Sequence, residues 1–342
     1  MGKYIIRRLL QAIPTMFGIT LLSYLIITAA PGGPAAALSF DPSVSPEQRA
    51  RLEERLGVND PWIVQYTHWL IGDDWRQRSI DEETGEPIYG NRQGILRGDF
   101  GDSFTRNQRP VLQVINEFIV PTLELTVAAL AFGLIFGIPI GVLAAIDRGG
   151  IFDNITRVLA VFFNAVPNFW LGLILILVFS VNLDWLPLSK RCATTLTGGC
   201  PPIWERMEYL VLPVITLGTV FVAGYSRYMR TSMLDVISQD YMRTAKAKGL
   251  SPREIWMKHG ARNALIPIAT FLGPAITGLL GGAVVTEAVF SWPGLGRTTL
   301  NAAVSQDYPL IMGAVVLGAF ATIFGYILSD ILYALIDPRI RF

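Results

Sequence analysis

The stretch S-Q-D-Y-M-R-T-A-K-A-K-G-L-S-P-R-E (residues 238–254) lies in a polar, basic segment between two long apolar runs. Residues 229–262 are called the basic segment. Residues 240–248 favour a short helix, and Gly249 suits the left-handed position that follows the end of many helices. The pattern therefore predicts a helix that stops at a glycine turn.

A second helix is predicted directly after this turn. Ser251 can cap it, Pro252 stands at its first position, and Glu254 is placed to complete a capping box with Ser251. Two capped helices joined by a glycine are a rigid structure that a partner protein can hold.

The composition is typical of a membrane protein, because 51% of the residues are hydrophobic and only 16% are charged. Six stretches of at least 18 residues carry no charge: 9–30, 125–146, 158–183, 209–226, 263–286 and 308–329. About 20 helical residues cross the hydrocarbon core of a bilayer. We predict an all-α integral membrane protein with six transmembrane helices.

These spans divide the chain into three parts: residues 1–30, 31–120 and 121–342. The first is the cytoplasmic N-terminal end with the first span. Its apolar run of 22 residues is longer than the roughly 7–15 of a signal peptide, so we expect an uncleaved anchor. The second part is a large extracytoplasmic segment, and the third is a five-helix core that contains the basic segment.

The orientation follows from the placement of lysine and arginine. With the N-terminus inside, the cytoplasmic segments hold 15 basic residues and the two short outer loops hold four. Residues 31–124 are too long for this rule to apply, and they contain nine arginines against fifteen acidic residues. Both termini are expected in the cytoplasm.

The large outer segment has elements of its own. Residues 46–56 predict a short charged helix, and the apolar spacing over residues 62–70 predicts an amphipathic helix on the membrane surface or against the spans. Residues 72–98 are polar and have no assigned role. Residues 89–91 suggest the turn of a hairpin.

Small residues and prolines interrupt the spans. Gly133, Gly137 and Gly141 recur every fourth residue, so another helix can approach that face closely. We favour packing within the same subunit over a dimer interface. Prolines inside a span mark either a cavity or a plain kink. Four prolines interrupt the predicted spans: Pro139, Pro167, Pro213 and Pro274.

Cys192 and Cys200 lie in the predicted outer loop 184–208. A disulfide there would close a short loop facing an oxidising compartment and contribute about 2.5 kcal/mol. The alternative is two unpaired thiols in a poorly ordered loop.

Glu287 follows the fifth predicted span. An acid near a membrane span is a candidate functional residue. It could equally cap the following turn by accepting hydrogen bonds from backbone N–H groups.

Signals of enzymatic chemistry are missing from the sequence. No stretch fits the phosphate-binding pattern G-x-x-x-x-G-K-[ST], and no histidine or cysteine pair has metal-ligand spacing. We therefore expect no catalytic residue, no metal site and no cofactor bound by this chain.

The basic segment resembles the signature loop of permease subunits of ATP-binding-cassette importers, whose E-A-A-x-x-x-G motif docks into a cleft of the ATPase. Ala245 and Gly249 match that motif, whereas Arg243 and Thr244 replace its glutamate and first alanine. The run R-T-A-K-A-K-G is similar to the variant of the dipeptide/oligopeptide branch. Further similarities to this branch, and to its B-type permease at the N-terminus, run along the chain: 4–9, 30–34, 98–103, 226–234, 262–267, 287–290, 293–296 and 337–341.

The resemblance implies a type I importer permease fold and roles for particular residues. The ATPase-coupling loop would use Asp240, Tyr241, Arg243, Thr244, Ala245, Lys248, Gly249, Ser251 and Glu254. The translocation path or gate would involve Glu287, Pro274 and Tyr326. Tyr326 stands where the branch usually has asparagine, and residues 72–96 resemble an insertion.

The function implied is that of a permease subunit, in the inner membrane of a prokaryote, for ATP-driven import of di- and oligopeptides. Its implied partners are a homologous second permease, two ATPase subunits that bind ATP and magnesium, and an extracytoplasmic solute-binding protein. No nucleic acid is expected as a partner. The selective subunit is usually the binding protein, so the sequence leaves the substrate open.

Two other functions are considered. The same machinery could import an oligosaccharide or a nickel chelate. A stand-alone secondary transporter normally carries paired charges at mid-depth, and the charge-free spans argue against it.

Overall fold

The computed structural model describes residues 2–29, 60–80, 85–90, 92–193, 199–268, 275, 278 and 283–336. The chain forms two compact units. The larger unit comprises Met1–Ile5, Val120–Arg297 and Ala321–Phe342, and the smaller unit comprises Ile6–Ile119 and Thr298–Phe320.

Long helices dominate the described residues, as the apolar runs predict. The four longest are α1 (Gly2–Ala29), α5 (Val111–Ile146), α8 (Met207–Ile237) and α15 (Tyr308–Ile336). Each contains a stretch long and apolar enough to cross a membrane. They coincide with the first, second, fourth and sixth predicted spans, and the all-α fold class is confirmed.

Shorter elements occupy the chain between α5 and α15. In order, they are α6 (Ile151–Ala165), α7 (Asn168–Leu175), the π-helical turn η3 (Ile176–Asn182), the 3-10 turn η4 (Ile203–Glu205), α9 (Asp240–Ala247), α10 (Pro252–Glu254), the π-helical turn η5 (Ile255–Ala261), α11 (Arg262–Ala264), α13 (Val284–Val289) and α14 (Leu295–Val304).

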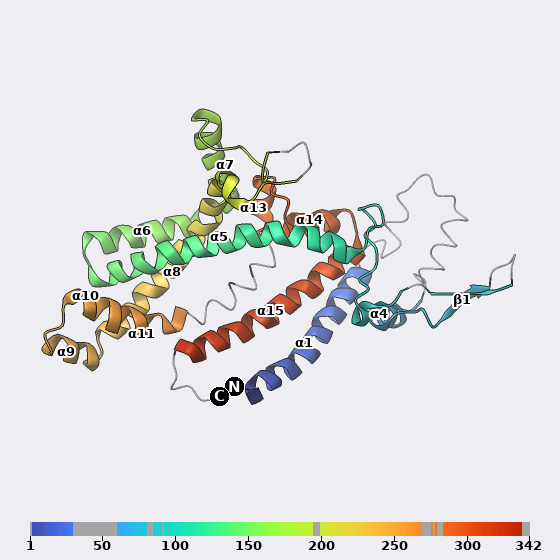
Figure 1. Ribbon diagram of the computed structural model, residues 1–342, viewed down its shortest axis with the longest axis horizontal. Helices are drawn as coiled ribbons and strands as arrows, with labels where there is room; N and C mark the ends of the chain where they lie inside the picture. Colours follow the sequence, from blue (N-terminus) through green and yellow to red (C-terminus); the bar gives the residue numbers. More distant parts are fainter. Residues whose placement is uncertain are drawn as a thin grey trace. The chain divides into compact units, whose positions relative to one another are not determined.

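The third predicted span, residues 158–183, is not one straight helix. α6 runs alongside α8 (Figure 1), and the chain then bends by 100° into α7 and η3. Pro167 explains the bend, because proline cannot donate a backbone hydrogen bond and pushes the preceding residue out of the α region. Val166 is accordingly extended, with φ −70° and ψ 124°.

The fifth predicted span, residues 263–286, lies mostly outside the described residues, as does Pro274. If the bent pair α6–α7 is counted as one span, the described part of the chain contains up to five candidate spans.

The glycines of α5 face α8 in the larger unit. A Cβ at Gly137 would lie 3.0 Å from the Cβ of Tyr225, and one at Gly141 would lie 2.7 Å from the Cβ of Met229. Since side chains do not approach so closely, only glycine allows the two helices this spacing. The predicted packing within one subunit is confirmed.

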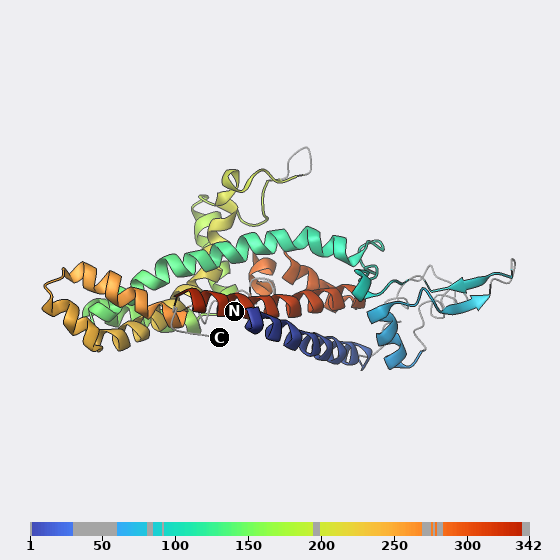
Figure 2. The ribbon, with the colours of Figure 1, turned by 60° about the horizontal axis from the view of Figure 1, so that its bottom comes forward.

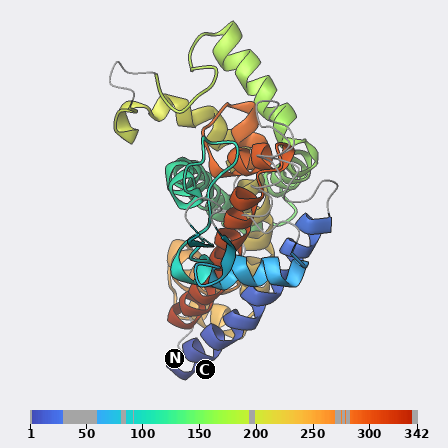
Figure 3. The ribbon, with the colours of Figure 1, turned by 90° about the vertical axis from the view of Figure 1, so that its right-hand side faces the viewer.

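In the smaller unit, the helix predicted over residues 62–70 is α4 (Trp62–Ile71). It packs against α1 (Figure 3), where Tyr24, Tyr66 and Met312 form a buried cluster and the Thr20 and Tyr66 hydroxyl groups lie 2.9 Å apart. Of the two predicted positions, on the membrane surface or against the spans, the structure shows the second.

A short hairpin follows α4 (Figure 2). It pairs β1 (Gln77–Ile80) antiparallel with β2 (Pro87–Tyr89), and the 3-10 turn η2 (Ile95–Arg97) comes after it. A hairpin is present in this segment, but residues 89–91 are not its turn, because Tyr89 belongs to β2 and pairs with Gln77. β-Favouring Ile88 and Tyr89 extend the strand to that point. Asn91 lies outside the described residues. The predicted helix 46–56 lies outside the described residues.

Charged side chains attach this hairpin to α4. The two terminal nitrogens of Arg78 donate to Asp60 and Asp73, each at 2.8 Å. Burial, together with neighbouring Arg78 and Arg76, lowers the pKa of His68 on α4 below its usual range. His68 is therefore neutral at pH 7.

Candidate functional site

The basic segment begins at the end of α8 and forms a helical hairpin. α9 starts at Asp240, only three positions after α8 ends at Ile237, and stops at Ala247. Gly249 has φ +69°, the left-handed conformation that the sequence predicts. A Cβ at this glycine would meet no atom within 4 Å, so the turn needs glycine for its backbone conformation alone.

The predicted capping box is present. The Ser251 hydroxyl accepts from the Glu254 backbone N–H at 3.3 Å, and the Glu254 carboxylate accepts from the Ser251 hydroxyl at 2.7 Å and from its N–H at 3.1 Å. These bonds from Ser251 hold the pKa of the Glu254 carboxyl below its usual range. Glu254 is therefore ionised at neutral pH, as a capping carboxylate near a helix N-terminus should be.

The two helices have a small core of their own. Met242 and Ala245 of α9 are buried against Ile255 at the start of η5. The Lys246 ammonium lies 5.4 Å from the centre of the Trp256 ring, which is within the range of a cation–π interaction. The hairpin is therefore a packed structure.

The hairpin is also fixed to α8. Met229 and Met233 of α8 are fully buried in a cluster with Ala261 and Ala264. The Ser232 hydroxyl donates to the Ala264 carbonyl at 2.8 Å. The helical hairpin and the end of α8 thus form one continuously packed body.

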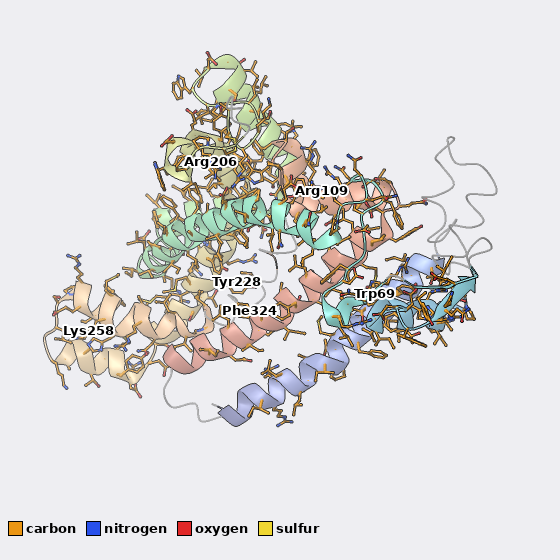
Figure 4. All side chains as sticks on the ribbon, turned by 45° about the vertical axis from the view of Figure 1, so that its right-hand side comes forward. Trp69, Arg109, Arg206, Tyr228, Lys258 and Phe324 are labelled. Carbon is orange, nitrogen blue, oxygen red and sulfur yellow. A yellow bond between two sulfur atoms is a disulfide. The ribbon has the colours of Figure 1, made fainter. Side chains whose placement is uncertain are left out.

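The remaining faces of the hairpin are open. Eight of the nine predicted coupling residues are exposed, and the exception is Ala245, which supports the core between the helices. The exposed positions also include Arg253, Met257 and Lys258, which the motif comparison missed although their basic and apolar character was visible in the sequence. Figure 4 shows Lys258 on this hairpin.

The exposed surface is positively charged. Residues 240–258 contain five basic and two acidic side chains, all of them exposed. Among these described residues, one ion pair links two exposed side chains, joining Asp240 to Arg243 at 3.6 Å, and such exposed pairs are weak. The surface therefore suits a partner with acidic groups.

Glu287 lies elsewhere in the larger unit and is fully buried. Its carboxylate accepts from the Thr122 hydroxyl at 2.8 Å and from the Arg297 backbone N–H at 2.7 Å. Thr122 in turn accepts from the Leu295 N–H at 2.7 Å. Glu287 therefore accepts a backbone N–H of the following turn, as one of its two predicted roles requires. It fixes the turn between α13 and α14 to α5.

The other predicted path residues do not join Glu287 in a described site. Tyr326 is an exposed residue of α15, and Pro274 lies outside the described residues. A role for these three positions in translocation stays a prediction.

Cys192 and Cys200 form a disulfide with a Cα–Cα distance of 5.7 Å. Their loop is attached to α5 through Glu124, whose carboxylate accepts from Arg191 at 2.6 Å and from Arg206 at 2.8 Å. Arg206, which is labelled in Figure 4, is a buried residue. Sequence reasoning missed this cluster because its members are 67 and 82 positions apart.

Two family profiles together match nearly the whole chain. "Binding-protein-dependent transport system inner membrane component" matches residues 137–342, and the corresponding N-terminal profile, "Binding-prot-dependent transport system membrane comp, N-term", matches residues 1–128.

The chain is similar over its full length to named permease proteins. It is 41% identical over 354 residues to the oligopeptide transport system permease protein AppB of Bacillus subtilis (strain 168), with all of both chains covered. It is 37% identical to the dipeptide transport system permease protein DppB of Escherichia coli (strain K12), covering 100% of this chain and 99% of that protein. It is 36% identical to the glutathione transport system permease protein GsiC of Salmonella choleraesuis (strain SC-B67), with both chains fully covered.

The fold resembles that of a solved structure, the inward-facing MetNI methionine ABC transporter. The TM-score is 0.52 at 18% identity, and the match covers 66% of this chain and 97% of the other.

Proposed function

Since this chain belongs to the family of binding-protein-dependent transport system inner membrane components, we propose that its basic segment is the surface that docks on a partner ATPase. The chain is a non-enzymatic permease subunit of an ATP-binding-cassette importer, and ATP hydrolysis occurs in partner subunits. The family also implies a substrate-binding protein as a partner.

The observation that carries this proposal is the capped hairpin fixed to α8. A transmission element must keep its shape when a partner moves it, and rigid elements transmit displacement between discrete packings. The Gly249 turn, the Ser251–Glu254 box and the Met242–Ile255 core provide that rigidity. The exposed basic side chains provide the contact surface.

The proposed assembly contains this chain, a homologous second permease, two ATPase subunits and one solute-binding protein. ATP and magnesium belong to the ATPases. Both termini of this chain and its basic segment face the cytoplasm, which the ratio of 15 basic residues to four supports.

The proposed substrates are di- and oligopeptides. The names of the similar permeases refer to oligopeptides, dipeptides and glutathione, itself a tripeptide. Import of an oligosaccharide or a nickel chelate is the alternative, and a ligand screen on the partner binding protein decides between them.

Charge reversal tests the docking surface. Lys248→Glu should reduce the amount of ATPase that co-purifies with the solubilised permease, because it places a carboxylate where the partner is expected to be acidic. Lys190→Glu is the matched control, since Lys190 is also exposed but lies in the disulfide loop. Equal ATPase recovery with Lys248→Glu and the wild type would refute docking through this surface.

Thiol labelling tests the orientation. After mild reduction of intact cells, a membrane-impermeant maleimide should label Cys192 and Cys200. If the cysteines are labelled only after the cells are opened, the proposed orientation is wrong.

A further inference from the structure

An ion pair between a buried carboxylate and a half-buried arginine joins α6 to α8 in the larger unit. The Asp153 carboxylate of α6 accepts from Nε of Arg230 and, at 2.7 Å, from Nη2 of Arg230 on α8. It also accepts from the Gly149 N–H at 2.9 Å. Asp153 is fully buried, and a second arginine, the exposed Arg157, also forms an ion pair with it at 3.6 Å.

Arg230 lies near the end of α8, where the basic segment begins. Met229, Ser232 and Met233 contact the returning chain through Ala261 and Ala264, while Arg230 binds α6. The end of α8 is therefore attached to the helical hairpin by packing and to α6 by a bidentate charged pair. Paired hydrogen bonds of this kind fix orientation as well as distance.

α6 leads to the second half of the bent pair. After the break at Val166 and Pro167, Gly172 of α7 packs against α13, where an added Cβ would lie 3.1 Å from the Phe290 ring and 3.2 Å from Val289. Val289 follows Glu287, which fixes the next turn to α5. A contiguous set of contacts thus runs from the basic segment to the turn between α13 and α14.

We propose that the Asp153–Arg230 pair transmits displacement of the basic segment to α6, so that α6 moves with α8 and the α6–α7 pair bends at Val166–Pro167. Asp153 and Arg230 are positioning residues for coupling ATP hydrolysis to transport. This inference rests on the function proposed above. Because elements in contact need not move together, the experiment below measures coupling directly.

A double variant without the two charges distinguishes a loss of transmission from a loss of stability. Removing Arg230 alone takes the bidentate partner from a buried carboxylate, which is destabilising, whereas Asp153→Asn combined with Arg230→Gln removes both charges of the pair and keeps a polar side chain at each position. Reconstituted in liposomes, this double variant should keep its ATPase subunits and hydrolyse ATP, while peptide uptake per ATP falls about fivefold. Arg148→Gln, which removes an exposed charge between α5 and α6, should match the wild type.

Wild-type uptake per ATP in the double variant would overturn the inference while leaving the proposed docking of the ATPase intact. Loss of ATPase binding in Lys248→Glu is a separate result and tests only the docking.

A distance measurement keeps the inference testable even if the double variant does not assemble. Spin labels at Ile155 of α6 and Asn263 of α11, both exposed and outside the proposed docking surface, report whether these elements move together in the assembled complex. The distance between the labels should stay the same in nucleotide-free and ATP-trapped complexes. A nucleotide-dependent change in that distance would show that α6 moves independently and would refute the proposal.

Discussion

Substitution of Gly249 tests whether the glycine turn is required for coupling. Gly249 has φ +69°, a conformation that costs an ordinary L-residue about 1–2 kcal/mol. A β-branched side chain resists it more, at roughly 1–3 kcal/mol. Because an added Cβ meets no atom within 4 Å, these backbone costs are the whole intramolecular effect.

Coupling efficiency should be highest with glycine at position 249 and should fall in the order asparagine, alanine, valine. Asparagine tolerates the left-handed conformation better than other side chains do, so Gly249→Asn should stay near the wild type. Gly249→Ala should populate a displaced turn about 5- to 30-fold more than glycine does, and Gly249→Val should reduce coupling furthest. All three chains should insert into the membrane, since the substituted position lies outside the predicted spans.

Reconstituted complexes provide the assay, with ATP hydrolysis and peptide uptake measured on the same liposomes. Wild-type uptake per ATP in Gly249→Val would refute the role of the turn. If Gly249→Asn is as impaired as Gly249→Val, backbone conformation is not the cause, and close approach of the partner to Gly249 becomes the explanation.

Three further changes test other parts of the structure. Ser251→Ala removes a helix cap and should lower the stability of the second helix by about 1 kcal/mol. Hydrogen exchange at the Glu254 amide should then be faster, and unchanged exchange would contradict the capping box. Glu287→Gln replaces a carboxylate that accepts hydrogen bonds from Thr122 and Arg297. It should lower the free energy of unfolding by about 1.5–3 kcal/mol, and with it the melting temperature of the solubilised protein. Gly141→Ala places a methyl group against Met229 and should cost about 1–3 kcal/mol; an unchanged melting temperature would mean that α5 and α8 are not closely packed.

The basic segment could be predicted from sequence because its signals are local. Gly249 ends one helix and Ser251 with Glu254 begins the next, all within six residues. Capping depends on neighbours in the chain, so no knowledge of the tertiary fold is needed. The four long helices were predictable for a related reason, since each contains a long charge-free run of consecutive residues.

The features that sequence reasoning missed depend on distant partners. Asp153 and Arg230 are 77 positions apart, and Glu124 and Arg206 are 82 apart. Each was visible as a charge near a predicted span, but only the tertiary packing brings the partners together. Pro167 predicts an interruption of the third span, yet the angle of the bend depends on what α6 and α7 pack against.

The close approach of α5 and α8 has a consequence for biosynthesis. Residues 147–206 separate the two helices, and a ribosome adding about 5–20 residues per second needs about 3–12 seconds to produce them. During that interval the glycine face of α5 has no partner within the chain and faces lipid or the insertion machinery. A newly made chain therefore has a time window in which a foreign helix can occupy this face, and synthesis rate across residues 147–206 becomes a factor in the yield of correctly assembled protein.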